Sequence, residues 1–113
     1  ERTGSLGMTL VSNDSEEGLT PSKFHVSSNY PNPFNPSTMI DIETVEARDL
    51  IVSIFDATGR LVNDLLNEYV EAGRYSVKWN GVDATGSGMP TGVYFIRVQS
   101  GFDMHTQKMI LIK

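Results

Sequence analysis

The chain has 113 residues, no cysteine and a formal net charge of −5, with 39% hydrophobic and 20% charged residues. Such a composition is typical of a single globular domain, and it excludes disulfides and thiolate metal sites. It also argues against a nucleic-acid partner, which needs a basic surface. No apolar run approaches the roughly 18 residues of a membrane span, so no transmembrane segment is expected.

The first 22 residues (ERTGSLGMTLVSNDSEEGLTPS) show no sustained hydrophobic period and are rich in Gly, Ser, Thr and acidic residues. They are predicted to be a linker from an upstream domain, with one short strand over 8–11. Residues 23–113 are then the folded domain. The chain begins without methionine and without a signal-peptide pattern, so we expect it to be part of a longer protein.

Beyond the linker, short apolar segments alternate with turn signals at regular intervals, which is typical of strands joined by tight turns. Seven segments are predicted as strands: 23–28, 38–43, 50–55, 60–66, 72–80, 92–99 and 104–113. The dense apolar run over 50–55 predicts a central strand covered on most of both faces. Residues 63–70 also fit a helical turn, which is too short to change the fold class.

The alternation within two segments predicts which side chains face the core. The residues expected to face inward are Tyr75, Val77, Trp79, Tyr94, Ile96 and Val98. The pattern as a whole predicts an all-β fold, an immunoglobulin-like Greek-key β-sandwich of about seven strands without the disulfide of antibody domains.

The run NYPNPFNPST (29–38) joins the first two predicted strands. Each proline pushes the residue before it into an extended conformation, so the run predicts a stiff connector across one end of the sandwich. We expect its asparagines to bond to nearby backbone and its two aromatic residues to pin it to the sandwich, with docking of a partner as the alternative. The connector motif comprises Tyr30, Pro31, Asn32, Pro33, Phe34, Asn35 and Pro36.

No motif in the chain points to catalysis or to a cofactor. The two histidines, His25 and His105, have no partner at a metal-ligand or nucleophile spacing and are expected to be exposed strand residues. The repeated sequence D-A-T-G at 56–59 and 83–86 lacks the dense carboxylates of a calcium loop, so turn formation is the better interpretation. We therefore expect no enzyme activity, no metal and no cofactor.

A carbohydrate-binding module is an open alternative, because β-sandwiches with exposed aromatic residues often bind sugars. Trp79 and Tyr75 are the candidate platform, although their alternation with Ser76 and Lys78 is that of a core face.

Five segments occur in an order that resembles a known family: NYPNPFNPST (29–38), IFDATGRLV (54–62), AGRYSVKWNG (72–81), PTGVYFIRV (90–98) and KMILIK (108–113). Together they resemble the C-terminal sorting domain, type A subtype, of cargo proteins exported by the type IX secretion system. The resemblance covers residues 23–113. Residues 79–94 also resemble the immunoglobulin-like domain of flagellar hook-capping proteins, and the two families share a fold.

The resemblance implies a secretion signal rather than an enzyme. Such a domain follows a cargo in the same chain, is recognised by the type IX translocon in a Gram-negative outer membrane, and is removed by a sortase-like peptidase. The cargo passes through the periplasm and ends at the cell surface or in the medium. A structural spacer or assembly module, as in the hook cap, is the alternative.

In the family, the last strand and the final residues are most tied to recognition. Mapped onto this sequence, the candidates are Gly101, Lys108, Met109, Ile110, Leu111, Ile112 and Lys113. Both faces of this last strand are apolar, which indicates either burial on both sides or an apolar surface with a free backbone edge for a partner or a second copy. Core burial and recognition are compatible with each other.

Cleavage needs an extended, accessible peptide, and the polar linker fits that need. The candidate cleavage region comprises Val11, Ser12, Asn13, Asp14, Ser15, Glu16, Glu17 and Gly18.

Overall fold

The computed structural model describes residues 24–113. They form seven strands: β1 (Phe24–Val26), β2 (Thr38–Thr44), β3 (Arg48–Asp56), β4 (Leu61–Val70), β5 (Gly73–Trp79), β6 (Gly92–Ser100) and β7 (Asp103–Leu111). Within this part of the chain, no helix is long and apolar enough to cross a membrane. The predicted linker over 1–22, its short strand over 8–11 and the candidate cleavage region lie outside the described residues.

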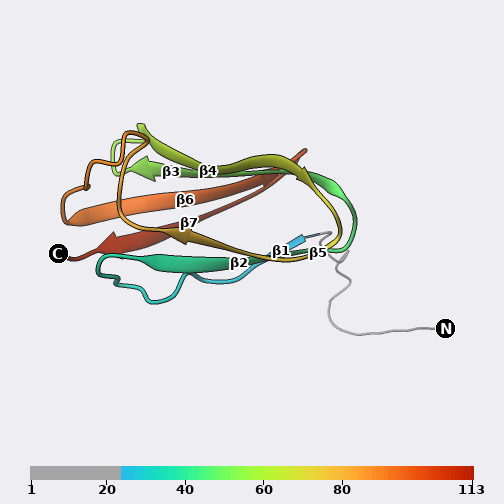
Figure 1. Cartoon of the computed structure of the whole chain (residues 1–113), viewed down its shortest axis with the longest axis horizontal. Coiled ribbons are helices and arrows are strands. Elements are labelled where there is room, and N and C mark those ends of the chain that lie inside the picture. The colour runs from blue at the N-terminus through green and yellow to red at the C-terminus, as the bar shows by residue number, and fades with distance from the viewer. Residues whose placement is uncertain (1–23) are drawn as a thin grey trace.

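The strands make two antiparallel sheets, one ordered β1-β2-β5 and the other β4-β3-β6-β7. The chain passes from one sheet to the other between β2 and β3, between β4 and β5, and between β5 and β6 (Figure 1). The apolar faces of the two sheets pack on each other to form the core. The predicted all-β, immunoglobulin-like sandwich is confirmed.

The predicted strands are confirmed in number and order, but their extents differ: β1 is shorter than predicted, and β3 and β4 are longer. β4 runs to Val70, which lies opposite Arg48 at the start of β3. The helical turn considered for 63–70 is therefore wrong, because pairing along the whole length of β3 keeps these residues extended. Register shifts in the β3–β4 pair obscure the alternation in the sequence.

The core follows the predicted alternation. The inward positions of β3 and β6 are 0–3% exposed: Leu50, Val52, Ile54, Tyr94, Ile96 and Val98. Trp79 at the end of β5 is 1% exposed, whereas Tyr75 and Val77 are only partly buried. β5 is an edge strand of the smaller sheet, so its inward residues have neighbours on one side only.

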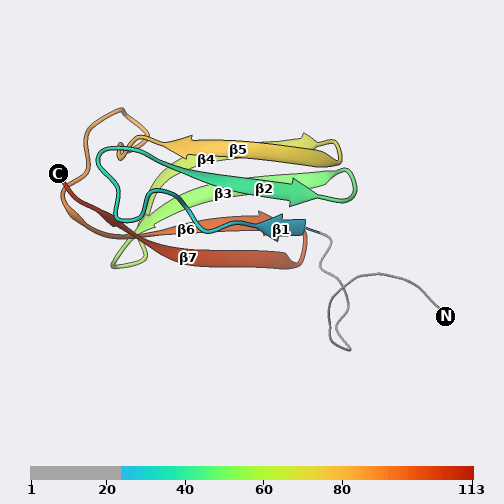
Figure 2. The same ribbon diagram turned by 90° about the horizontal axis from the view of Figure 1, so that it is seen from below.

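The expectation that the strand at 50–55 is covered on most of both faces agrees with its burial, because Leu50, Val52, Ser53 and Ile54 are buried and the other two residues are half-buried. All seven strands belong to the two sheets, and the loops lie at the two ends and along one edge (Figures 1 and 2). The cover on the outer face comes from neighbouring side chains of the four-stranded sheet itself, because no further strand of residues 24–113 packs on that face. Ile51 and Phe55 lie on that face and are half-buried.

Both D-A-T-G segments form the same turn, as predicted. Asp56 Oδ1 accepts hydrogen bonds from the Thr58 amide (2.9 Å), the Thr58 hydroxyl (2.6 Å) and the Arg60 amide (3.0 Å). Asp83 Oδ1 accepts the matching three bonds from Thr85 and Ser87. Hydrogen bonds hold the pKa of each aspartate below its ordinary value. In each turn the largest cause is the bond from the threonine hydroxyl, followed by the bond from the backbone amide of Arg60 to Asp56 or of Ser87 to Asp83.

The hydrogen bonds of Asp56 and Asp83 predict that the domain loses stability in acid. Because folding lowers the two pKa values, the stabilisation is present at neutral pH and is lost as the pH falls from the ordinary value of 3.8 through the lower folded values. The double variant Asp56→Asn, Asp83→Asn keeps an acceptor oxygen but cannot titrate. Its free energy of unfolding, measured by urea denaturation, should fall less steeply below about pH 4 than that of the wild type. Parallel pH profiles would contradict this assignment, and Asp49→Asn at an exposed site is the control.

Candidate recognition site at the C-terminal strand

β7 divides the candidate recognition residues between two faces of the sheet. Met109 and Leu111 are 0% exposed and belong to the core. Lys108 and Ile110 lie at the alternate positions, which face outward, where Lys108 is exposed and Ile110 half-buried. Burial in the core therefore accounts for one half of the apolar residues of this strand, and the other half lies on the outer face of the sheet.

The proline connector is brought together with the end of β7. The Phe34 amide donates to the Ile110 carbonyl and the Ile112 amide donates to the Phe34 carbonyl, both at 2.9 Å. The Asn32 side chain accepts from the Ile110 amide (3.0 Å) and donates to the Lys108 carbonyl (3.3 Å). The side-chain amide of Asn32 thus pairs with β7 as the backbone of a neighbouring strand would, and the expectation that the asparagines bond to nearby backbone is confirmed for Asn32.

These bonds change the prediction of a free backbone edge. Over Lys108–Ile112 the outer edge of β7 is already paired with the connector, so a partner strand or a second copy can pair there only if the connector moves. A partner that leaves the connector in place must bind the side chains of this region instead.

Contrary to the prediction from the sequence, the connector does not run straight across the end of the sandwich. β1 and β2 are antiparallel neighbours, so the connector reverses the chain direction and reaches β7 of the other sheet on the way. Gly81, at a φ of 73°, permits this path because a Cβ there would lie 3.1 Å from the Pro36 carbonyl oxygen.

Phe34 is the aromatic pin that the sequence predicts. Its side chain is 2% exposed, and its ring centroid lies 5.5 Å from that of Trp79, which in turn makes an edge contact with Tyr94 at 5.2 Å. The Trp79 Nε1–H donates to the Val82 carbonyl at 2.8 Å. Trp79 is therefore a satisfied core residue and cannot serve as a sugar-binding platform, which removes the main support for a carbohydrate-binding module.

Tyr30 is not a pin, contrary to the prediction. It is 49% exposed, and its hydroxyl donates to Asp41 Oδ2 at 3.1 Å. This hydrogen bond, together with the negative charge of Asp41, raises the pKa of the Tyr30 hydroxyl. The buried anchor at this point is Asn29, whose side chain donates to the Thr38 hydroxyl at 3.0 Å.

Gly101 lies far from the other candidates. It forms the β6–β7 turn with a φ of 61°, at the opposite end of the sandwich from the C-terminus (Figure 1). The structure therefore does not bring Gly101 together with residues 108–113, and its left-handed backbone gives it a role in turn formation.

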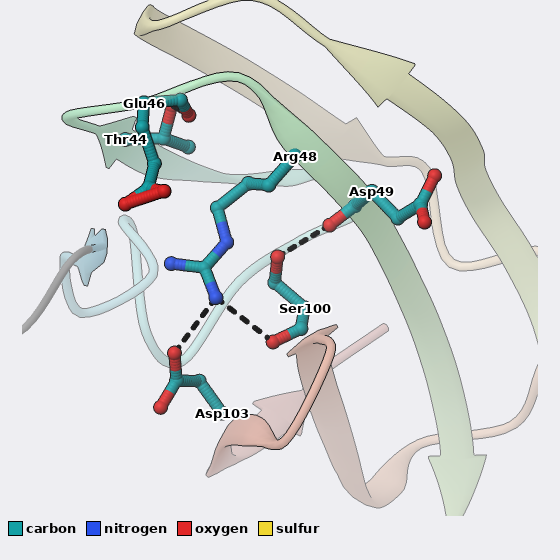
Figure 3. Close-up of polar contacts among 6 residues, drawn as sticks. All are labelled: Thr44, Glu46, Arg48, Asp49, Ser100 and Asp103. Carbon is teal, nitrogen blue, oxygen red and sulfur yellow. Dashed lines mark hydrogen bonds and ion pairs between the residues drawn. The ribbon is translucent and has the colours of Figure 1, made fainter.

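The end that holds Gly101 is tied together by Arg48, which sequence reasoning missed. Its Nη2 donates to Asp103 Oδ2 at 2.7 Å and to the Ser100 carbonyl at 3.1 Å, and the Ser100 hydroxyl donates to the Asp49 carbonyl (Figure 3). The guanidinium also lies 5.3 Å from the Phe24 ring centroid. Arg48 thus links β3 to the β6–β7 turn and to β1.

The two histidines line one groove of about 320 Å³ between β1 and β7, beside Asp103 and Met104. His25 is exposed, as expected, while His105 is half-buried with its Nε2 3.4 Å from Gln107 Oε1. Their separation along the chain gave no signal of this proximity. In residues 24–113, no three potential metal ligands cluster here or elsewhere.

Arg48 should contribute measurably to stability. Arg48→Ala removes two charged hydrogen bonds from a side chain that is 16% exposed, so we expect the free energy of unfolding to fall by about 1–3 kcal/mol. The matched control is Arg74→Ala, because Arg74 is 84% exposed and lies 3.7 Å from Glu43; there the loss should be at most about 0.5 kcal/mol. Equal losses in urea denaturation would show that Arg48 has no special role.

The two aromatic residues of the connector should differ in their contribution to the free energy of unfolding, measured by the same urea denaturation. Phe34→Ala empties a buried ring site and should cost about 3–5 kcal/mol. Tyr30→Ala removes an exposed ring and one hydrogen bond, and should cost less than about 1 kcal/mol. Trp79 fluorescence can follow unfolding in both variants, and a larger loss for Tyr30→Ala would contradict the assignment of Phe34 as the pin.

Three solved structures resemble this chain over most of its length. Dimeric latent PorU from Porphyromonas gingivalis is 26% identical with a TM-score of 0.61, and the match covers 87% of this chain and 10% of that chain. PorZ, an essential surface component of the type IX secretion system of the same organism, is 28% identical with a TM-score of 0.53. That match covers 80% of this chain and 11% of PorZ. FlgD from Xanthomonas campestris, which acts in hook capping for flagellar assembly, is 25% identical with a TM-score of 0.52. That match covers 80% of this chain and 62% of FlgD.

This chain therefore spans about a tenth of the first two structures. No curated protein sequence matches it. A family model described as the FlgD Ig-like domain matches residues 32–102, which is more than half of the 113 residues. The chain belongs to the FlgD Ig-like domain family.

Proposed function

We propose that this chain is a non-catalytic C-terminal sorting domain of the type IX secretion system, type A subtype. It targets an upstream cargo to the translocon of a Gram-negative outer membrane, and a sortase-like peptidase then cuts within the region Val11–Gly18. The cargo passes through the periplasm to the cell surface or the medium. The domain needs no cofactor for this role.

The observation that carries the proposal is the likeness to PorZ, a component of the type IX secretion system. It covers 80% of this chain at 28% identity but only 11% of PorZ, as expected for a small module within a larger protein. The five sequence segments that resemble sorting domains support the same function independently.

A structural assembly module is the second candidate. The family match over 32–102 and the likeness to FlgD of X. campestris favour it. Because this candidate shares the fold, only a functional assay separates it from a sorting domain.

The test is export of a fluorescent cargo fused in front of residues 1–113 and behind a periplasmic signal peptide, in a bacterium with a working type IX system. We expect cargo in the medium or on the surface, dependent on the translocon. The matched control replaces the chain by the immunoglobulin-like domain of X. campestris FlgD, which should leave the cargo in the periplasm.

Retention of both fusions, with the domain folded, would overturn the sorting role and leave the assembly module. Export of both would show that the fold alone is sufficient and that this chain carries no specific signal. Removal of residues 108–113 is a poor control, because it takes Met109 and Leu111 out of the core and would unfold the domain.

A further inference from the structure

The outer face of the four-stranded sheet carries a continuous apolar strip. In the strand register, Phe55 of β3 lies opposite both Leu61 of β4 and Phe95 of β6, while Val93 of β6 lies opposite Ile110 of β7. Leu61 is 52% exposed and Val93 36% exposed, and the other three are half-buried. These five residues, the apolar strip, cross all four strands near the C-terminal end of β7.

No further strand of residues 24–113 packs over the apolar strip, although the Arg97 guanidinium stacks on the Phe55 ring. All seven strands belong to the two sheets, and the loops lie at the ends and along one edge (Figures 1 and 2). A sheet with one solvated face normally alternates apolar and polar residues, so apolar residues at outward positions of four adjacent strands mark an interaction surface.

Cationic side chains stand beside the strip on β6 and β7, although the chain carries a net charge of −5. The outward positions of β6 and β7 hold two charged residues, Arg97 and Lys108. Lys108 lies directly opposite Phe95, and the Arg97 guanidinium stacks 4.4 Å from the Phe55 ring centroid. On the β4 side, the Asp64 carboxylate accepts a hydrogen bond from Ser53 at 2.7 Å.

We infer that the apolar strip, with Arg97 and Lys108, is the surface on which this domain docks an acidic protein surface that has an apolar patch of its own. The inference rests on the proposed function, in which that surface belongs to the export machinery. The residues of the terminal strand then have two roles: Lys108 and Ile110 recognise the partner, while Met109 and Leu111 hold the strand in the core.

A protein partner fits better than an anionic membrane. Two cations next to the strip would contribute only about 1 kcal/mol each to attraction by anionic lipid, and the negative charge of the whole chain opposes it. A local match between cations and carboxylates around an apolar centre is instead the arrangement of a specific protein interface.

The test uses the full-chain export fusion with substitutions that leave the core intact. Lys108→Glu reverses the charge, and the double variant Val93→Ser, Ile110→Ser removes apolar side chains from the strip. The matched controls are Lys78→Glu, exposed on β5 of the other sheet, and Val45→Ser, which is 68% exposed in the β2–β3 turn. Lys108→Arg keeps the charge. Thermal unfolding of each purified chain checks the fold.

We expect export to fall by about tenfold for Lys108→Glu and for the double variant, while both controls and Lys108→Arg export like the wild type and all variants unfold at the wild-type temperature. Normal export of either Lys108→Glu or the double variant would overturn the inference, and so would loss of export for Lys108→Arg. Failure of the wild-type fusion itself would refute the proposed function instead.

Two further measurements test the other occupants. Sizing of the purified chain that shows a dimer, broken by the double variant but not by Val45→Ser, would assign the strip to a second copy and overturn the inference. Flotation with phosphatidylglycerol vesicles that is lost in Lys108→Glu but not in Lys78→Glu would assign it to lipid, with the same consequence.

Discussion

The pairing of Phe34 with the end of β7 is the contact on which both the fold and the candidate site depend. Its backbone joins the connector of one sheet to Ile110 and Ile112 of the other, and its ring enters the core beside Trp79. The sandwich is thereby closed at this end by one residue that serves both sheets. Without Phe34 and the Asn32 side chain, residues 108–112 would present an unpaired edge, which is the feature that β proteins most need to protect.

The prolines explain why this closure does not simply move the edge outward by one strand. A proline has no backbone N–H, so a segment that contains Pro31, Pro33 and Pro36 cannot donate a regular ladder of hydrogen bonds to a further strand. The connector contributes only the Phe34 backbone and the Asn32 side chain to β7. The proline-rich run is therefore best understood as an edge cap, which limits self-association while it leaves the side chains of the sheet face accessible.

The sequence was sufficient for the parts of the structure that depend on local patterns. The period of two located the strands and the inward residues of β6, and the repeated D-A-T-G predicted two equal turns. Contacts between distant residues were not predictable: Arg48 and Asp103 are 55 positions apart, and neither stands in a motif. Tyr30 and Phe34 look alike in the sequence, and only the path of the connector decides that one is exposed and the other buried. The apolar run over 50–55 indicated a central strand with little exposure, but composition alone does not tell whether the cover comes from a further layer or from side chains within the sheet.

The terminal strand shows why a deletion cannot define a recognition site in such a domain. The family match covers residues 32–102, so β7, which begins at Asp103, lies outside it, as does the short β1 at the other end of the chain. The inward residues of β7 contribute to the stability of the sandwich and its outward residues continue the apolar strip, so any truncation removes both at once. Because the two sets alternate along one strand, single substitutions can separate them. If recognition resides in β7, it must be carried by the positions that the core leaves unused, and these are the outward residues beside β6.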